Sequence, residues 1–308
     1  MQLHRLHPEL RNVYRRIPAV PFHNRLFLAL LSLVQKLQRG KITPCDGVSI
    51  EDRVLGAAGV RIYRPLQGAT GAGLLWIHGG GYVIGAASTN DRECAALAGN
   101  LGLVVVSVEY RLAPKYPFPL PLDDCFAAWH FMLKSAEALG IDRERIAITG
   151  QSAGGGLAAA LAQRIADDGG VQPAAQLLTY PMLDDRTALR EELDAVRHRL
   201  WNNKNNRGAW GFYLGCDPGS DSLPEYAAPG RREDLSGLPP TWIAAGDLDL
   251  FYDEDCRYAE RLREAGVPCE FHTVQGAPHG FDLLAPEAGV SRAFNAEYSR
   301  FLRESLKL

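Results

Sequence analysis

Short apolar segments alternate with helical patterns over most of this 308-residue chain, and the alternation limits its fold more than any other feature. Segments rich in Val, Ile, Leu or Thr have the length and composition of strands at 52–64, 74–77, 103–108, 145–149, 175–179, 241–246 and 270–274. Helical patterns lie between most of them, at 91–99, 122–138, 155–167, 254–265 and 288–306. Strands that alternate with helices predict a mostly parallel sheet covered by helices on both faces.

Two regions do not follow this alternation. Residues 1–45 carry amphipathic helical patterns interrupted by prolines. Some 60 residues separate the strand ending at Thr179 from the strand opening at Thr241, and an excursion of that length needs structure of its own. We expect both regions to form a helical cap over one α/β domain at 46–308, with the cap insertion at about 184–216. The alternative is a pair of surface helices whose aromatic side chains face the core.

Composition limits the partners and the compartment of the protein. A hydrophobic fraction of 46% can bury one large core, and a net charge of −3 gives no general attraction to nucleic acid or to an anionic membrane. The six cysteines are scattered without a C-x-x-C pair, so we expect reduced thiols. The apolar run at 26–34 is too short to span a bilayer and lies too far into the chain for a signal peptide. These features predict a cytoplasmic protein that acts on a small, largely uncharged molecule.

A serine flanked by glycines lies between a predicted strand and a predicted helix. The segment 150–155 reads Gly-Gln-Ser-Ala-Gly-Gly and follows the strand that ends at Thr149. A tight turn here lifts the Ser152 hydroxyl clear of the sheet and sets it at a helix N-terminus, where a developing negative charge is stabilised. The pattern is typical of a catalytic nucleophile. The alternative is a glycine-rich loop in which the serine only caps the helix.

A serine hydroxyl needs a base to accept its proton and a third group to orient that base. Most of the eight histidines lie in predicted strands, helices or cap regions, which leaves His78 and His279. His279 follows the last predicted strand, in a loop that contains Gly and Pro and is expected at the carboxyl edge of the sheet. We therefore predict that His279 is the base for Ser152.

Three consecutive glycines follow His78 directly after a predicted strand. Because glycines leave the backbone unshielded, their N–H groups can approach a substrate oxygen. We expect Gly80 and Gly81 to form an oxyanion hole with Ala153, and His78 and Gly79 to support the loop. A phosphate-binding loop is the rival interpretation, but neither G-x-x-x-x-G-K-[ST] nor G-x-G-x-x-G is present here.

The acid that orients the histidine cannot be chosen from spacing alone. Asp247 and Asp249 both follow the strand at 241–246, where a buried carboxylate could reach Nδ1 of His279. The acidic residues at 253–255 begin a predicted helix, where the helix dipole favours them without further function.

Taken in order, these segments resemble the α/β-hydrolases of the hormone-sensitive-lipase-like family, the bacterial carboxylesterases with an HGGG motif. The likeness covers about residues 45–308. The segments that carry it are 78–81, 106–114, 117–119, 122–124, 150–155, 180–181, 249–254 and 279–281. The resemblance implies an α/β-hydrolase fold with a mostly parallel eight-stranded sheet and a helical cap. It also implies a triad of Ser152, Asp249 and His279, because 249–254 aligns with the family's Asp-Pro-Leu-x-Asp-Glu segment.

The family resemblance also implies the reaction, and two residues depart from its pattern. Gln151 stands where the family commonly has an acid, and Leu250 stands where it commonly has a proline. The implied function is a serine carboxylesterase that works through an acyl-enzyme and needs no metal or organic cofactor. The sequence shows no interfacial apolar surface, which favours soluble short- to medium-chain acyl esters over emulsified lipid. The alternatives are an amide hydrolase of the arylacetamide or formamide type, and a non-catalytic receptor for a small ligand.

Two further expectations concern the pocket and the assembly. The aromatic residues Trp201, Trp210, Phe212 and Tyr213 indicate an acyl or alcohol pocket of limited size, unless they form the core of the cap. The strand at 270–274 is expected at an edge of the sheet, where it could pair with a symmetry mate. Monomer and homodimer therefore both stay open.

Overall fold

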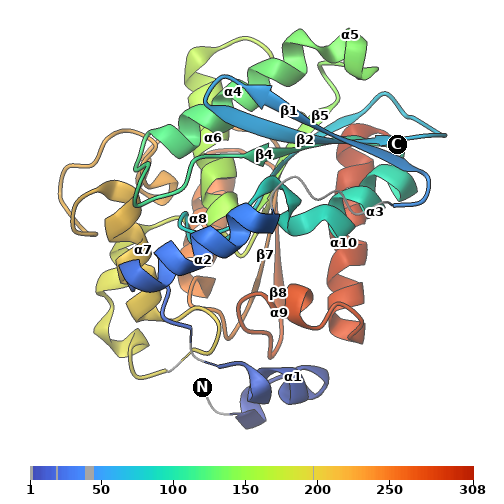
Figure 1. Cartoon of the computed structure of the whole chain (residues 1–308). Helices are drawn as coiled ribbons and strands as arrows, with labels where there is room; N and C mark the ends of the chain where they lie inside the picture. Colours follow the sequence, from blue (N-terminus) through green and yellow to red (C-terminus); the bar gives the residue numbers. More distant parts are fainter. Residues whose placement is uncertain (1–2, 19, 39–44, 197) are drawn as a thin grey trace.

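The computed structural model describes residues 3–18, 20–38, 45–196 and 198–308. Eight strands form one sheet in the order β1-β2-β4-β3-β5-β6-β7-β8 (Figure 1). The strands are β1 (Val48–Leu55), β2 (Ala58–Pro65), β3 (Gly73–Ile77), β4 (Val104–Glu109), β5 (Ile146–Gln151), β6 (Gln176–Thr179), β7 (Thr241–Gly246) and β8 (Cys269–Val274). β2 pairs antiparallel with β1 and β4, and all other neighbours pair in parallel. The predicted eight-stranded, mostly parallel sheet is confirmed.

One predicted strand is wrong in its extent. The segment 52–64 does not form a single strand but belongs to a hairpin, in which Leu55 of β1 lies opposite Ala58 of β2. Gly56 in the turn has a φ of +64°, a left-handed conformation that glycine adopts without steric cost. Because the turn lacks the Asn-Gly or Asp-Gly pair that marks most tight hairpins, the apolar pattern continues through it unbroken.

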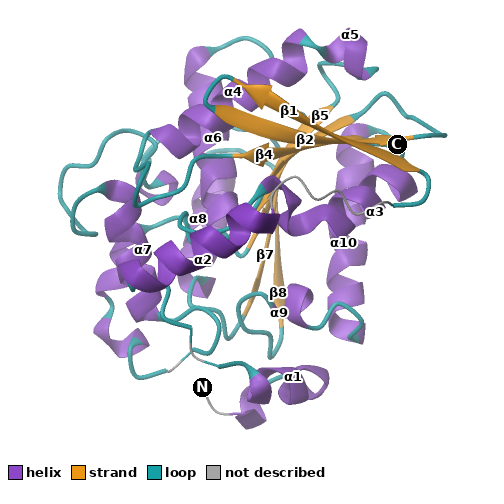
Figure 2. Ribbon diagram, in the orientation of Figure 1, coloured by secondary structure: helices purple, strands orange, loops and turns teal. Residues whose placement is uncertain are grey.

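Helices cover both faces of the sheet, as predicted (Figure 2). On one side lie α4 (Leu120–Lys134), α6 (Ala153–Asp168) and α8 (Tyr252–Glu264); on the other lie α3 (Asp91–Leu101) and α10 (Gly289–Leu306). These helices begin and end within a few residues of the predicted limits. The exception is the pattern at 122–138, which Ser135 divides into α4 and the short α5 (Ala136–Leu139). A further short helix, α9 (Phe281–Leu284), follows the last strand.

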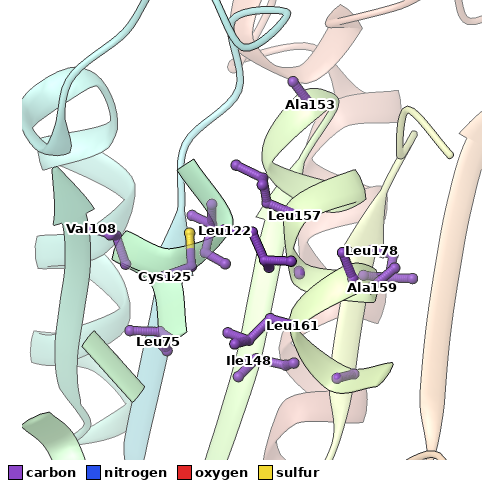
Figure 3. Close-up of a cluster of buried hydrophobic side chains, with 14 of the residues drawn as sticks. Leu75, Val108, Leu122, Cys125, Ile148, Ala153, Leu157, Ala159, Leu161 and Leu178 are labelled. Carbon is purple, nitrogen blue, oxygen red and sulfur yellow. The ribbon is translucent and has the colours of Figure 1, made fainter. Parts of the chain in front are cut away.

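Alternate residues of the central strands feed two hydrophobic clusters. In β3, Leu75 and Ile77 join the cluster under α4 and α6, whereas Leu74 and Trp76 join the cluster under α3 and α10. Figure 3 shows part of the first cluster, with side chains of the sheet gathered against those of α4 and α6. Each fully buried aliphatic side chain stabilises the fold by about 1.5–3 kcal/mol. Burial on both faces explains why these strands are continuous apolar runs.

The N-terminal region divides into two parts that contact different parts of the molecule. α1 (Arg11–Arg16) and the turns before it bury Leu6, Leu10 and Tyr14 in the cluster that also holds Ala277 and Phe281. In Figure 1, α1 lies apart from α2 (Arg25–Gln38), which lies beside α7 (Asn203–Leu214). Residues 39–44 of the predicted N-terminal cap lie outside the described residues.

The second part of the N-terminal region contacts the long excursion between β6 and β7. Nδ1 of His23 lies 2.9 Å from Oδ1 of Asn205, and the guanidinium of Arg25 lies 5.2 Å from the ring centroid of Phe212. Two segments that are far apart in the chain therefore meet on one side of the sheet. Within the described residues, no helix combines the length and apolar character needed to cross a membrane.

Candidate active site

Ser152 occupies a sharp turn between β5 and α6. Its φ is +56° and its ψ is −122°, a conformation that residues with a side chain rarely adopt. A Cβ on Gly150 would overlap the carbonyl oxygen of Gly154, and a Cβ on Gly154 would overlap the carbonyl oxygen of Ile77. Both flanking glycines are therefore required for this close approach of strand and helix. The strand, turn and helix expected around the serine are present.

The structure brings Ser152, His279 and Asp249 together at the carboxyl edge of the sheet. Nε2 of His279 lies 2.9 Å from Oγ of Ser152, and Nδ1 lies 2.8 Å from Oδ2 of Asp249. Each of the three residues is 7% exposed. This arrangement fits the tautomer in which Nδ1–H donates to the carboxylate and Nε2 accepts the serine proton.

The structure also distinguishes the two candidate acids. Asp249 turns back over its own loop, where Oδ1 accepts a hydrogen bond from the N–H of Phe251 at 3.0 Å and Oδ2 faces His279. Asp247 instead accepts from the N–H of Gly276 at 2.6 Å. Asp247 therefore ties the loop after β7 to the loop after β8, while Asp249 contacts the imidazole.

Three aromatic residues hold His279 in place, and motif reasoning did not assign this role to them. The rings of Tyr180 and Phe251 pack edge-on against the imidazole, with centroids 4.6 and 5.3 Å away. Tyr14 donates a hydrogen bond from its hydroxyl to the backbone carbonyl of His279 at 2.6 Å. Tyr180 donates in turn to Oδ1 of Asp282 at 2.8 Å. Tyr180 and Phe251 lie in segments that carry the family resemblance, 180–181 and 249–254, whereas Tyr14 carried no sequence signal.

The glycine loop after β3 lies beside the serine. Gly80 and Gly81 have φ values of +118° and +59°, and both line the same pocket as Ser152. A Cβ on Gly80 would overlap the carbonyl oxygen of Ile84, so glycine is needed here for space as well as for conformation. Ala153 is the first residue of α6, where a backbone N–H has no acceptor inside the helix. The three predicted oxyanion-hole residues therefore surround the serine.

His78 is fully buried and does not line the pocket. Its Nδ1 donates to the carbonyl of Gly79 at 2.7 Å, and its ring stacks on Tyr110 with centroids 4.1 Å apart. The Tyr110 hydroxyl donates to the carbonyl of His78 at 2.9 Å. These contacts brace the glycine loop from behind, which agrees with the supporting position predicted for His78 and Gly79.

The pocket above the serine has a volume of about 230 Å³. Trp201 from the excursion and Phe22 from the N-terminal region both line it, with ring centroids 5.7 Å apart. A Cβ on Gly81 would overlap the Trp201 ring, so the indole lies directly against the glycine loop. Of the four aromatic residues expected to shape the pocket, Trp201 is the one that lines it.

The other three aromatic residues lie elsewhere in the same region. Trp210 and Tyr213 are fully buried and pack against Tyr82. Phe212 is half-buried and lies beneath Arg25. These residues form the internal packing of the region, which is the alternative that the sequence left open.

Several buried ionisable groups surround the site. Burial raises the pKa of Asp282 to about 6 and lowers the pKa of His198 to about 4, so His198 is neutral at pH 7. Gln151 is uncharged, and its Oε1 accepts a hydrogen bond from Nδ2 of Asn90 at 3.1 Å. No cluster of three or more His, Cys, Asp or Glu among the described residues is arranged to hold a metal ion.

The sheet, the serine turn and the histidine loop together define an α/β-hydrolase. A family model described as alpha/beta hydrolase fold matches residues 74–283, and the chain belongs to this family. It is 39% identical over 279 residues to Esterase LipI of Mycobacterium tuberculosis, covering 86% of this chain and 85% of the relative. It is 34% identical to Ethyl acetate hydrolase of Pseudomonas putida, with 72% of this chain and 70% of the relative covered.

Comparison with solved structures supports the same family. The chain is similar to the structure of Bacterial Heroin Esterase with a TM-score of 0.89, 38% identity and 99% coverage of both chains. It is similar to esterase LipW from Mycobacterium marinum with a TM-score of 0.86, 35% identity and coverage of 98% and 96%. The likeness therefore extends over nearly the whole length of the chain.

Proposed function

We propose that the protein is a serine carboxylesterase that cleaves small esters through an acyl-enzyme. The observation that carries the proposal is the continuous hydrogen-bonded chain from Ser152 through His279 to Asp249. Ser152 and His279 line a pocket beside two glycines with positive φ. The names of the relatives, which include an esterase and an ethyl acetate hydrolase, support an ester as the substrate.

The first half of the reaction, acylation of Ser152, begins with a proton transfer from Ser152 to His279. Oγ of Ser152 attacks the ester carbonyl carbon while its proton passes to Nε2 of His279. The carbonyl oxygen becomes an oxyanion, which accepts hydrogen bonds from the N–H groups of Gly80, Gly81 and Ala153. As the intermediate collapses, the bond to the alcohol oxygen breaks and Nε2–H protonates that oxygen, so the alcohol leaves and the acyl group stays on Ser152.

Deacylation repeats the sequence with water. His279 accepts a proton from water, whose oxygen attacks the acyl carbon, and the same N–H groups bind the second oxyanion. The proton then returns to Oγ as the carboxylic acid leaves. In both steps Asp249 holds the imidazole in one tautomer and stabilises the imidazolium.

We also propose that parts of two regions cap the pocket. Phe22 and Trp201, from 1–45 and 184–216, both line the 230 Å³ cavity and contact each other. This small, aromatic-walled space supports short- to medium-chain acyl esters as substrates. α1 is not part of this cover, because its buried side chains pack with Ala277 and Phe281 behind the histidine loop.

We also propose a cellular compartment and an oligomeric state for the protein. Five cysteines are free thiols, namely Cys94, Cys125, Cys216, Cys256 and Cys269, which supports a reducing compartment such as the cytoplasm. β8 lies at one edge of the sheet, which leaves monomer and homodimer as the expected states. Light scattering coupled to size-exclusion chromatography distinguishes the two.

Substitution of the nucleophile tests the function. Ser152→Ala should lower kcat for p-nitrophenyl acetate by a factor on the order of 10⁴ to 10⁶ while the thermal midpoint stays close to that of the parent. Ser222→Ala, an exposed serine outside the pocket, is the matched control and should keep full activity. A fluorophosphonate probe should label the parent and not Ser152→Ala. Undiminished turnover by Ser152→Ala would refute the proposal.

The same assay separates esters from amides. p-Nitroacetanilide presents the same acyl group on nitrogen, and we expect a kcat/KM at least 100-fold below that for p-nitrophenyl acetate. A faster reaction with the anilide would show that the triad serves an amide hydrolase.

A further inference from the structure

A second cavity of about 290 Å³ lies beside the active-site pocket, on the face of the sheet covered by α3 and α10. We call it the second chamber. Trp76, Leu97, Leu101 and Phe294 give it apolar walls, and residues of α9 also line it. The proposed reaction does not use this space.

The second chamber and the active-site pocket share a wall. Gln151 and Leu283 line both cavities, and Gln151 directly precedes the nucleophile. Leu283 belongs to the four-residue helix α9 and is 42% exposed. An exposed leucine changes rotamer within nanoseconds, so its side chain can open a passage between the cavities without movement of the sheet.

The wall and the chamber offer hydrogen-bond donors. Oε1 of Gln151 accepts from Asn90, whereas its Nε2 has no acceptor among the described residues. Nε1 of Trp76 is buried and has no partner within the described part of the chain. Because buried polar groups are normally paired, the Trp76 donor favours an occupant that carries an acceptor oxygen, and Nε2 of Gln151 can donate to such an oxygen as well.

Charges at the chamber select against anions. Arg92 is paired with Glu287 at 3.0 Å, and the remaining ionisable lining residues are the phenol of Tyr298 and the carboxyl groups of Glu93 and Asp282. An occupant with a negative tail would face these groups without a free cation among the described lining residues. The chamber therefore fits an uncharged group.

The volumes of the two cavities indicate what kind of molecule occupies them. Small-molecule sites typically measure roughly 300–1,000 Å³, and the active-site pocket of about 230 Å³ falls below that range. Together the two cavities lie within it. A single ester that occupies both would place its carbonyl at Ser152 and its tail beyond Gln151.

We infer that the second chamber receives the uncharged, mainly apolar tail of the ester substrate, which passes between Gln151 and Leu283 and accepts a hydrogen bond from Nε2 of Gln151 through a carbonyl or ether oxygen. This inference rests on the proposed esterase function and specifies the substrate of the same site. It also gives Gln151 a role as a specificity residue.

Filling the chamber tests the inference. Ala96 is exposed on α3 and lines the chamber but not the active-site pocket, so Ala96→Trp blocks the chamber without touching the core. Ala296→Trp, on the exposed face of α10 outside both cavities, is the matched control. Each variant is assayed with p-nitrophenyl acetate, with p-nitrophenyl octanoate for an acyl tail, and with octyl acetate for an alcohol tail.

The expected result is selective. Ala96→Trp should leave kcat/KM for p-nitrophenyl acetate unchanged and lower it at least fivefold for one octyl substrate, which identifies the side of the ester that enters. Equal values for both octyl substrates in Ala96→Trp and in the parent would overturn the inference, as would an equal loss in Ala296→Trp. Failure of the parent to hydrolyse any ester would instead contradict the proposed function.

A second measurement isolates the Gln151 amide. In ether analogues of the better octyl substrate, oxygen replaces one methylene at a time while the length stays constant. The parent should bind one analogue with a KM at least threefold below that of the hydrocarbon, and Gln151→Met should abolish this preference. If no ether oxygen lowers the KM of the parent enzyme, the hydrogen bond assigned to Gln151 is wrong.

Discussion

The hydroxyl of Tyr14 and the backbone carbonyl of His279 are joined by a hydrogen bond of 2.6 Å, although 265 positions separate them in the chain. The Tyr14 ring is fully buried in the cluster that contains Leu10, Ala277 and Phe281. Asp249 orients the imidazole ring, while Tyr14 holds the backbone that carries it. An N-terminal segment thus stabilises the loop of the proposed base.

Tyr14→Phe should therefore affect turnover more than binding. Loss of one buried hydrogen bond costs about 1 kcal/mol of stability, and we expect kcat to fall by about threefold to tenfold with KM unchanged. Tyr226→Phe is the matched control, because it removes a hydroxyl that donates to Asp167 outside the pocket. Steady-state kinetics with thermal denaturation measures both effects. An equal decrease of kcat in both variants would argue against a positioning role for Tyr14.

Substitutions of the two acidic residues after β7 should lower kcat to very different extents. Asp249→Asn removes the charge that faces Nδ1 of His279 and favours the wrong tautomer, so kcat should fall by roughly 10⁴-fold. Asp247→Asn keeps an oxygen that can accept from Gly276, and its kcat should fall by less than about tenfold. Stopped-assay kinetics at pH 8 compares the two. A greater loss in Asp247→Asn would reverse the assignment.

Trp201 should limit the width of the pocket. Its ring lies against Gly81 and contacts Phe22. Trp201→Leu therefore replaces a large side chain by a smaller one and widens the pocket beside the glycine loop. We expect the ratio of kcat/KM for p-nitrophenyl benzoate to that for p-nitrophenyl acetate to rise at least fivefold. Phe212→Leu, in the same region but outside the pocket, should leave the ratio unchanged. A constant ratio in both variants would show that another residue sets the width.

Glu254 should make stability depend on pH. Burial raises the pKa of this carboxyl from 4.5 to about 8, so the folded protein keeps a proton that the unfolded chain has released. The free energy of unfolding contributed by this group is therefore fully present below about pH 4.5 and is lost as the pH rises to about 8.

Glu254→Gln tests this dependence because it retains Oε1, which accepts from the N–H groups of Leu183 and Asp184. The fall in Tm between pH 5 and pH 8 should be smaller in this variant than in the parent. Glu260→Gln, an exposed residue on the same helix, should reproduce the parent curve. Parallel curves for parent and Glu254→Gln would exclude Glu254 as the source.

Local patterns in the sequence were sufficient to predict most of the architecture. Apolar residues that face the core recur with one spacing in strands and another in helices. This spacing can be recognised within a short run of consecutive residues. The β1–β2 hairpin escaped prediction because its turn, at Gly56, lacks a characteristic residue pair. The strand-end positions of Ser152 and His279 were also local features, since loops that follow parallel strands gather at one edge of the sheet.

Tertiary structure alone decided which side chains meet. Asp247 and Asp249 both lie in the loop directly after β7, and only the folded structure shows that Asp249 is the one that reaches His279. Tyr14 could not be assigned from its own segment, because its partner lies at the far end of the chain. The wall shared by Gln151 and Leu283 also depends on where α9 packs. Contacts between distant segments follow from the packing of the whole core, and no local period of the sequence encodes them.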